Sequence, residues 1–149
     1  MLDKSVIELR LMKLREYKSI LEDIKKEKLE TFIRNPRIYG SAERFLQLAI
    51  ECCIDIANHI ISIKSEKVPE THSEIFEILG DLLSIDEEIL NKFLNMIRFR
   101  NLLVHSYLKI NHEEIYEILQ SNLDDFDEFS KIILNYLNQF NEKHDENLS

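Results

Sequence analysis

The sequence predicts an all-α protein, an antiparallel up-and-down bundle of four long helices and one short helix. Only two glycines and two prolines occur in 149 residues, far below their combined average of about 12%, so a fold that needs many turns is disfavoured. Apolar residues recur at three- and four-residue spacing over long segments, which is the period of an amphipathic helix. No linker composition divides the chain, so we expect one domain over residues 1–141 and a polar C-terminal tail over 142–149.

The first helix is expected over residues 3–30, because one side of this segment is apolar and the other side is charged. Segment 34–40 then interrupts the pattern. Pro36 disfavours a helical conformation at Asn35, and Gly40 can adopt a positive φ. The apolar stripe of the first helix consists of Val6, Leu9, Leu14, Tyr17, Leu21 and Ile24.

The second long helix is expected from Ser41, a good N-cap residue, to about Lys64. It is the most apolar segment of the chain, so it is expected at the centre of the bundle. It contains Cys52 and Cys53, and neighbouring cysteines seldom form a disulfide with each other. Two buried thiols in a reducing compartment are therefore expected, which places the protein in the cytoplasm. No transmembrane segment or signal peptide is predicted.

The second half of the chain shows three further helix starts. A connector over 65–70 precedes a capping box at 71–74, which opens the short helix. This helix is expected to run to about Leu79 and to close at Gly80 or Ser84. A second capping box is expected at 84–87.

That second capping box opens the fourth helix, which is expected to run to about Val104. Asn111 opens the last helix, and the apolar stripe of this helix reaches Phe140. The acidic run 124–128 within it is expected to form a solvated face.

The net charge and the absence of several known motifs disfavour some classes of function. The formal charge is −9, which disfavours unspecific coating of a nucleic acid, because the phosphate backbone repels negative charge. The sequence has no glycine-rich phosphate loop and no His-x-x-x-His or Cys-x-x-Cys pair. Neither a metal site nor a cofactor is predicted.

Segment 98–107, between two expected helices, contains two arginines, an asparagine, a histidine and a tyrosine. Histidine exchanges protons near neutral pH, and the planar guanidinium of arginine binds phosphate, so these residue types suit metal-free cleavage of a phosphodiester. On a continuous helix Arg100 and His105 lie about 140° apart. Either the helix ends near Val104 or the two side chains meet across a dimer interface. The alternative is a helix C-terminus with favourably placed cations and a structural histidine.

Arg100, the four residues after it, His105, Ser106 and Tyr107 match the Arg-x(4–6)-His-x-Tyr motif of the HEPN superfamily. The likeness extends over most of the chain. The matching segments are 41–60, 68–70, 99–105 and 124–126. The sequence resembles the HepT-like toxin branch of that superfamily, the partner of MntA-type minimal nucleotidyltransferases.

The resemblance implies a HEPN-like homodimer in which two motifs line a shared cleft. It implies a metal-independent endoribonuclease toxin of a toxin–antitoxin system, in which the 2′-hydroxyl of RNA attacks its own phosphate. It assigns Arg100 to stabilisation of the phosphorane and His105 to general acid or base catalysis. A cognate MntA-type nucleotidyltransferase antitoxin is expected to neutralise the toxin by AMPylation of Tyr107. Asn101 is expected to position groups in the cleft.

Further residues are assigned supporting or structural roles. Arg98 is expected in the cleft or at its rim, and Arg44 and Asp55 are expected to hold the motif helix from behind. Asp55 and His59 are also spaced for a hydrogen-bonded pair along one helix, which is the simpler interpretation.

His72 and His112 are expected at the surface, because both lie at helix starts. Two other functions remain open. One is a non-catalytic HEPN module that binds a nucleotide or a nucleotidyltransferase partner, and the other is a dimerisation scaffold without a ligand. The polar cluster in 98–107 disfavours the scaffold.

Overall fold

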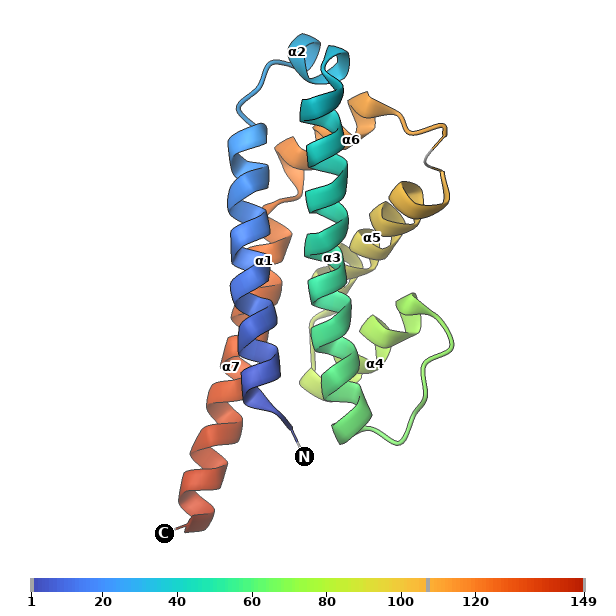
Figure 1. Cartoon of the computed structure of the whole chain (residues 1–149). Helices are drawn as coiled ribbons and strands as arrows, with labels where there is room; N and C mark the ends of the chain where they lie inside the picture. The colour runs from blue at the N-terminus through green and yellow to red at the C-terminus, as the bar shows by residue number, and fades with distance from the viewer. Residues whose placement is uncertain (1, 107, 149) are drawn as a thin grey trace.

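A computed structural model describes residues 2–106 and 108–148, and the side chains of that set as far as Phe140. These residues form seven helices and no strand, which confirms the all-α fold (Figure 1). The helices are α1 (Lys4–Ile24), α2 (Leu29–Arg34), α3 (Pro36–Lys64), α4 (His72–Leu83), α5 (Glu87–His105), α6 (His112–Ser121) and α7 (Asp124–Leu148).

Helix α3 is the centre of the molecule, as its apolar sequence predicts. It contacts every other described helix, with α1 and α7 on one side and α4 and α5 on the other (Figure 1). By length and hydropathy alone α3 could span a membrane. Its apolar side chains are instead buried against the neighbouring helices, as in the core helix of a helical bundle.

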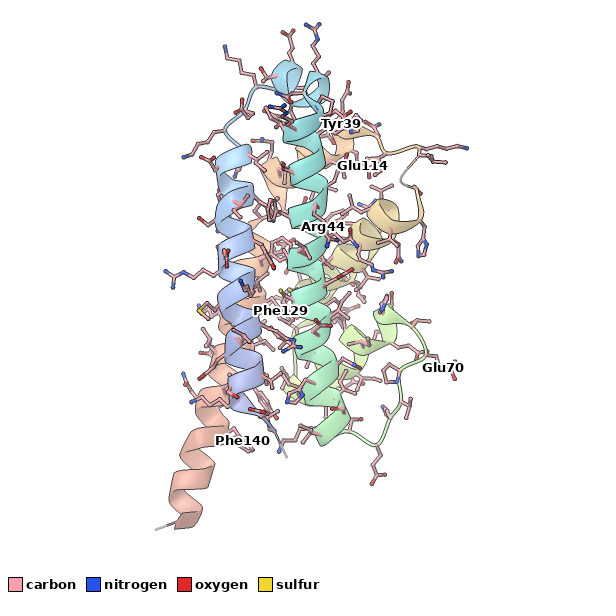
Figure 2. All side chains as sticks on the ribbon, in the orientation of Figure 1. Tyr39, Arg44, Glu70, Glu114, Phe129 and Phe140 are labelled. Carbon is pink, nitrogen blue, oxygen red and sulfur yellow. The ribbon has the colours of Figure 1, made fainter. Side chains whose placement is uncertain are left out.

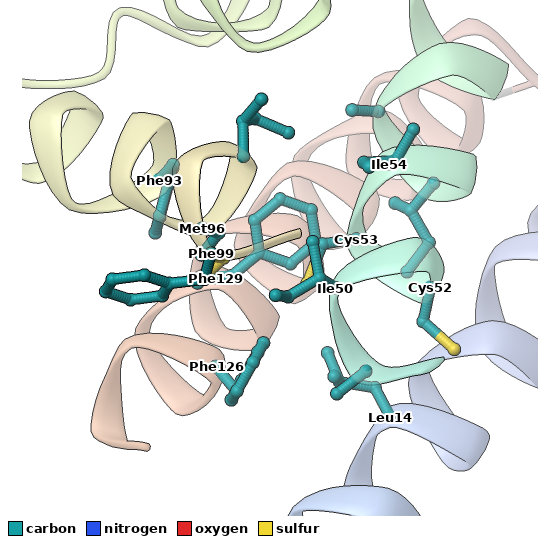
Figure 3. Close-up of a cluster of buried hydrophobic side chains, with 14 of the residues drawn as sticks. Leu14, Ile50, Cys52, Cys53, Ile54, Phe93, Met96, Phe99, Phe126 and Phe129 are labelled. Atoms are coloured by element: carbon teal, nitrogen blue, oxygen red, sulfur yellow. The ribbon is translucent and has the colours of Figure 1, made fainter. Parts of the chain in front are cut away.

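Aromatic side chains from three helices meet on one side of α3. Phe76 of α4, Phe93 of α5 and Phe129 of α7 are fully buried. The ring centroids of Phe93 and Phe129, both labelled in Figure 3, are 5.3 Å apart. The ring of Phe76 lies 6.2 Å from that of Phe93 and 6.0 Å from that of Phe129. Tilted and edge-on contacts at these distances are favourable for aromatic rings. This cluster joins α4, α5 and α7 into one core.

The chain turns earlier than expected after the first helix. Helix α1 ends at Ile24, and the separate helix α2 follows after a short polar turn. The turn allows Phe32 of α2 to become fully buried, with its ring centroid 5.4 Å from that of Tyr116 on α6. Burial of one aromatic side chain therefore overrides the helical pattern of residues 25–30.

The expected helix start at Ser41 is wrong, because α3 begins at Pro36. The side chain of Asn35 accepts a hydrogen bond from the Arg37 N–H at 3.0 Å. Proline suits the first position of a helix, where its missing N–H leaves no hydrogen bond unmade. Gly40 therefore lies inside α3 without a positive φ.

Two boundaries in the second half also differ from expectation. Helix α4 extends to Leu83, beyond its expected end near Leu79. Ser84, one of the two residues expected to close it, does so in a left-handed conformation with φ 53° and ψ 47°. Because Ser84 caps α4, it does not cap α5, which starts after Asp86 without a side-chain cap. The predicted last helix is divided at Asn122 into α6 and α7.

Helix α7 continues to Leu148, so the polar tail expected over 142–149 is helical up to that residue.

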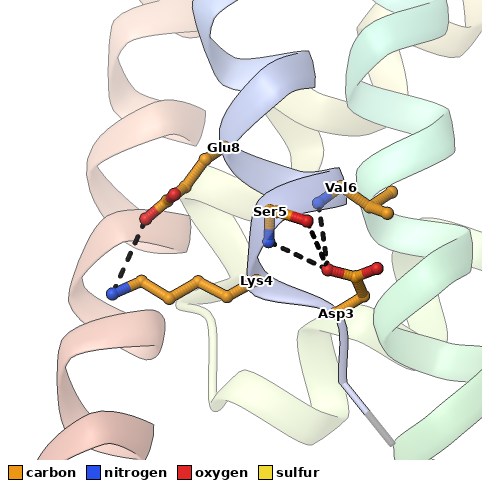
Figure 4. Close-up of polar contacts among 5 residues, drawn as sticks. All are labelled: Asp3, Lys4, Ser5, Val6 and Glu8. Carbon is orange, nitrogen blue, oxygen red and sulfur yellow. Dashed lines mark hydrogen bonds and ion pairs between the residues drawn. The ribbon is translucent and has the colours of Figure 1, made fainter.

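The start of α1 is fixed by Asp3. Its Oδ1 accepts hydrogen bonds from the backbone N–H groups of Ser5 and Val6 at 3.0 and 3.4 Å (Figure 4). Its own backbone N–H donates to Nε2 of His59 at 3.2 Å. The expected hydrogen-bonded pair between Asp55 and His59 is therefore wrong, since His59 binds the N-terminal segment instead.

Candidate active site

The end of α5 carries the polar segment that begins at Arg98. Helix α5 ends at His105, one residue beyond the expected end. The N–H of Ser106 donates to the carbonyl of Leu102 at 3.2 Å, and the N–H of Lys109 donates to the carbonyl of Ser106 at 2.8 Å. The chain therefore turns directly after His105. Tyr107 lies outside the described residues.

A pocket of about 610 Å³ opens beside the end of α5. It lies between α3, the start of α4, the connector that precedes α4, and α5. Its volume falls within the range of about 300–1,000 Å³ that is usual for small-molecule sites. Its lining consists of Asn58, Pro69, Glu70, Thr71, His72, Ser73, Ile75, Ile97, Arg100, Asn101 and His105.

Arg100 and His105 both line this one pocket, although they lie about 140° apart around the helix axis. Ile97 and Asn101, which also line the pocket, fall between them at about 100° per residue. The pocket therefore follows a broad face of α5. Within a single chain, the two motif residues therefore border the same pocket.

Arg100 has unused hydrogen-bonding capacity. Its side chain is half-buried, and Nη1 donates to Oδ1 of Asn101 at 3.4 Å. Its Nε is buried and has no acceptor among the described residues. A buried donor without an acceptor is unfavourable by about 1–3 kcal/mol.

The opposite side of the pocket is the start of α4. Thr71 caps this helix, since its Oγ1 accepts a hydrogen bond from the Glu74 N–H at 3.1 Å. Glu74 in turn accepts one from the Glu70 N–H at 2.7 Å. A helix N-terminus carries a partial positive charge that favours an anion. Glu70 adds a carboxylate to the lining, from the outer edge of the connector (Figure 2).

His105 also borders a second hollow of about 260 Å³, with Ser106, Leu108 and Lys109. The imidazole is exposed. It is therefore accessible both from the main pocket and from the side of the loop that follows α5.

The structure groups Arg100, Asn101 and His105 in one pocket, whereas Arg98, Asp55 and Arg44 lie outside its described lining. Arg98 lies 4.8 Å over the ring of Phe99, and its Nη1 is 3.4 Å from Oε1 of Glu114 on α6. Asp55 lies 3.7 Å from Nε of Arg10 on α1. Arg44 is exposed on α3 (Figure 2). None of these three is among the described lining of the pocket.

His72, which the sequence predicts at the surface, lies in the lining of the pocket. Its capping box marks the start of α4 correctly, but nothing local indicates that this start lies beside the end of α5. That contact depends on the packing of α4 against both α3 and α5. Asn58 also lines the pocket. It lies among apolar residues of α3, so its place in the sequence does not indicate a site residue either.

Two curated relatives are named as nucleases. The chain is 28% identical to the mRNA nuclease HepT of Shewanella oneidensis, in an alignment that covers 67% of this chain and 85% of the relative. It is 26% identical to the tRNA nuclease HepT of Aphanizomenon flos-aquae, over 94% of this chain and 95% of the relative.

A solved structure has the same fold. It is a tri-AMPylated HEPN toxin of Shewanella oneidensis in complex with the MNT antitoxin, which superposes with a TM-score of 0.80 at 23% identity. The match covers 89% of this chain and 99% of that one. Residues 11–133 match the family model described as ribonuclease HepT-like. The chain therefore belongs to the ribonuclease HepT-like family.

Proposed function

We propose that this protein is the endoribonuclease toxin of a HepT/MntA-type toxin–antitoxin system and that the pocket of Arg100 and His105 is its active site. One observation carries the proposal. A proton-exchanging side chain and a guanidinium with an unused donor line the same nucleotide-sized pocket. Membership of a ribonuclease-like family supports the same reaction class.

In the proposed reaction, the 2′-hydroxyl oxygen of RNA attacks the adjacent phosphorus. The P–O2′ bond forms and the P–O5′ bond breaks, which leaves a 2′,3′-cyclic phosphate and a 5′-hydroxyl. His105 accepts the proton of the 2′-hydroxyl as general base. Arg100 donates to the non-bridging oxygens, where negative charge builds up in the phosphorane. Asn101 positions the guanidinium through Nη1 of Arg100. No step in this scheme uses a metal ion.

The net negative charge of the chain limits where RNA can bind. At a formal charge of −9, most of the surface repels a phosphate backbone. Positive charge near the site comes from Arg100 and from Lys109 beside the smaller hollow. RNA contact is therefore local to the pocket and weakens with added salt.

The proposal includes a homodimer. Val68 and Leu108 are 84% and 83% exposed, although both are large apolar residues. Val68 precedes Pro69 of the main pocket, and Leu108 borders the smaller hollow. Exposed apolar side chains next to a site favour coverage by a protein surface. A second copy would cover both residues and bring two pockets together.

The proposed regulator is a cognate MntA-type nucleotidyltransferase antitoxin. The hydroxyl oxygen of Tyr107 would attack the α-phosphate of ATP, so that AMP is attached and pyrophosphate leaves. Tyr107 is two residues from His105, so the added negative charge would repel the RNA phosphate. Co-expression with the antitoxin should add at least one AMP unit to the mass of the protein, and Tyr107→Phe should abolish that addition.

The test of catalysis uses the purified full chain and RNA in buffer with EDTA. We expect fragments with 2′,3′-cyclic phosphate ends, and we expect His105→Ala to stop cleavage while the far-ultraviolet circular dichroism stays unchanged. In cells, expression without the antitoxin should arrest growth, and His105→Ala should relieve the arrest. Equal growth with both proteins would contradict the toxin function.

The same pocket supports one alternative, a non-catalytic module that binds a nucleotide or a nucleotidyltransferase partner. An unused guanidinium donor in a pocket of about 610 Å³ also fits a nucleotide phosphate. Isothermal titration with AMP and ATP distinguishes the two functions. Binding without any RNA cleavage in the assay above would favour the module.

A cytoplasmic location fits the cysteines. Cys52 and Cys53 are both free thiols, and both are buried. Free buried thiols persist without oxidation in a reducing compartment.

A further inference from the structure

We infer that His72 is a second catalytic histidine, the general acid that protonates the 5′-oxygen as it leaves. This inference rests on the proposed ribonuclease function and assigns a residue outside the Arg-x-x-x-x-His motif. The imidazole of His72 belongs to the first residue of α4 and lines the same pocket as Arg100 and His105. The two histidines come from different helices, so they approach a bound phosphate from different elements of the pocket.

The histidines of the described side chains fall into two groups. His59 and His112 are structural, since Nε2 of His59 binds the Asp3 N–H at 3.2 Å and Nδ1 of His112 lies 3.0 Å from Glu43. His72 and His105 have no hydrogen-bond partner for their rings among the described residues, and both line the pocket. A ring without a structural partner keeps both nitrogens available to a substrate.

The chemistry requires a second proton transfer. When the P–O5′ bond breaks, the departing 5′-alkoxide must take up a proton, because an alkoxide is a poor leaving group. His105 has just accepted the 2′-hydroxyl proton and is the base in that step. A protonated His72 supplies the proton to the 5′-oxygen, and exchange with water then restores both rings. Histidine suits each role, because its ordinary pKa of about 6.5 permits both protonation states near neutrality.

Glu70 is the remaining ionisable side chain in the described lining, apart from Arg100 and the two histidines. It lies at the outer edge of the connector (Figure 2). His72 is half-buried, whereas Glu70 is exposed. The geometry therefore favours His72 over Glu70 as the acid.

The experiment compares two substrates of the full-length protein. One is a dinucleotide with an ordinary phosphodiester, and the other is the 3′-(4-nitrophenyl phosphate) ester of the same first nucleoside. Nitrophenolate leaves without a proton, so this ester needs the base but not the acid. His72→Gln should slow cleavage of the dinucleotide about 100-fold or more. Cleavage of the ester should stay within about threefold, since only the acid is lost.

Three further variants control the result. His105→Gln should slow both substrates, and His59→Gln, which replaces a histidine outside the pocket, should slow neither. Glu70→Gln should leave the preference between the substrates unchanged. His72→Asn repeats the test with a smaller neutral amide, and thermal unfolding reports whether each variant is folded.

Equal loss on both substrates, or no loss on either, would overturn the assignment of His72. Selective loss on the dinucleotide in Glu70→Gln would transfer the role to Glu70 and overturn it as well. If the wild-type protein cleaves neither substrate, the proposed ribonuclease function fails together with the role of His72. These results are distinguishable, because a failure of His72 alone leaves wild-type cleavage intact.

Discussion

Glu43 of α3 and His112 at the start of α6 are joined by a distance of 3.0 Å between Oε1 and Nδ1. The ring of Tyr39 stacks on the imidazole with a centroid separation of 3.8 Å. This contact fixes the end of the loop that begins after His105. The start of α6 is therefore held against α3 by a polar and an aromatic contact outside the pocket.

Stability should depend on pH through Glu43. Burial raises the pKa of its carboxyl above the ordinary value of 4.5, and His112 offsets this only in part. A carboxyl with a raised pKa favours folding below pH 4.5, and that contribution is lost as the pH rises through the raised pKa. The free energy of unfolding of Glu43→Gln, measured with urea, should rise relative to wild type between about pH 4 and pH 7. A constant difference would contradict this.

Gly40→Ala should stabilise the protein by about 0.5–1 kcal/mol, because glycine is unfavourable inside a helix. A Cβ at this position meets no atom within 4 Å. Gly80→Ala is the matched control inside α4, where the Cβ would lie 3.2 Å from Cδ1 and Cδ2 of Leu90. We expect the control to gain less. Thermal unfolding of the two variants measures the difference, and equal gains would contradict the packing at Gly80.

Phe129→Ala should destabilise the protein by about 3–5 kcal/mol, since it opens a cavity in the core. Phe129 is fully buried against Phe76 and Phe93. Leu134→Ala on the same helix is the control, because Leu134 is 47% exposed. Its effect should stay within about 1 kcal/mol. Urea unfolding compares the two, and similar losses would show that α7 packs differently.

Substitution of Arg100 should lower the cleavage activity much more than substitution of Arg98. Arg100→Ala removes the guanidinium from the pocket and should lower kcat/KM for RNA by about 100-fold or more. Arg98→Ala removes an exposed pair with Glu114 and should lower kcat/KM by less than about fivefold. Comparable losses in the cleavage assay would mean that Arg98 also contacts the substrate.

The thiols should resist alkylation in the folded protein. Burial raises the pKa of Cys52 to about 11, so about 0.1% of it is thiolate near pH 8. The pKa of Cys53 is also raised by burial. Mass spectrometry after treatment with iodoacetamide should show little modification of the native protein and two modifications in urea. Rapid modification without urea would contradict the burial.

Much of the fold is predictable because helix signals are local. Asp3, Thr71 and Asn111 each cap a helix close to where the sequence places its start. The errors occur where two local signals compete. At Pro36 and Gly40, the cap at Asn35 dominates over the glycine, and at Ser84 the closure of α4 dominates over a new cap.

The site is predictable in part for the same reason. Arg100, Asn101 and His105 lie within six residues of one another, so their sequence pattern identifies them together. His72 reaches the pocket through the packing of α4, which local sequence does not specify. Asp55 shows the reverse case, since its spacing suits a partner on its own helix but tertiary packing places Arg10 of α1 beside it.

One face of helix α5 packs in the core, and another face lines the pocket. Ile97 is the one residue shared by them, since it is buried and also lines the pocket. The other pocket residues of α5 are half-buried or exposed, whereas Phe93, Met96, Phe99 and Leu103 are buried in the core. Substitutions at partly exposed positions usually change stability little. The residues that line the pocket and the residues that hold α5 in the core are therefore largely separate sets, so substitutions in the pocket can be tested for their chemistry while the protein stays folded.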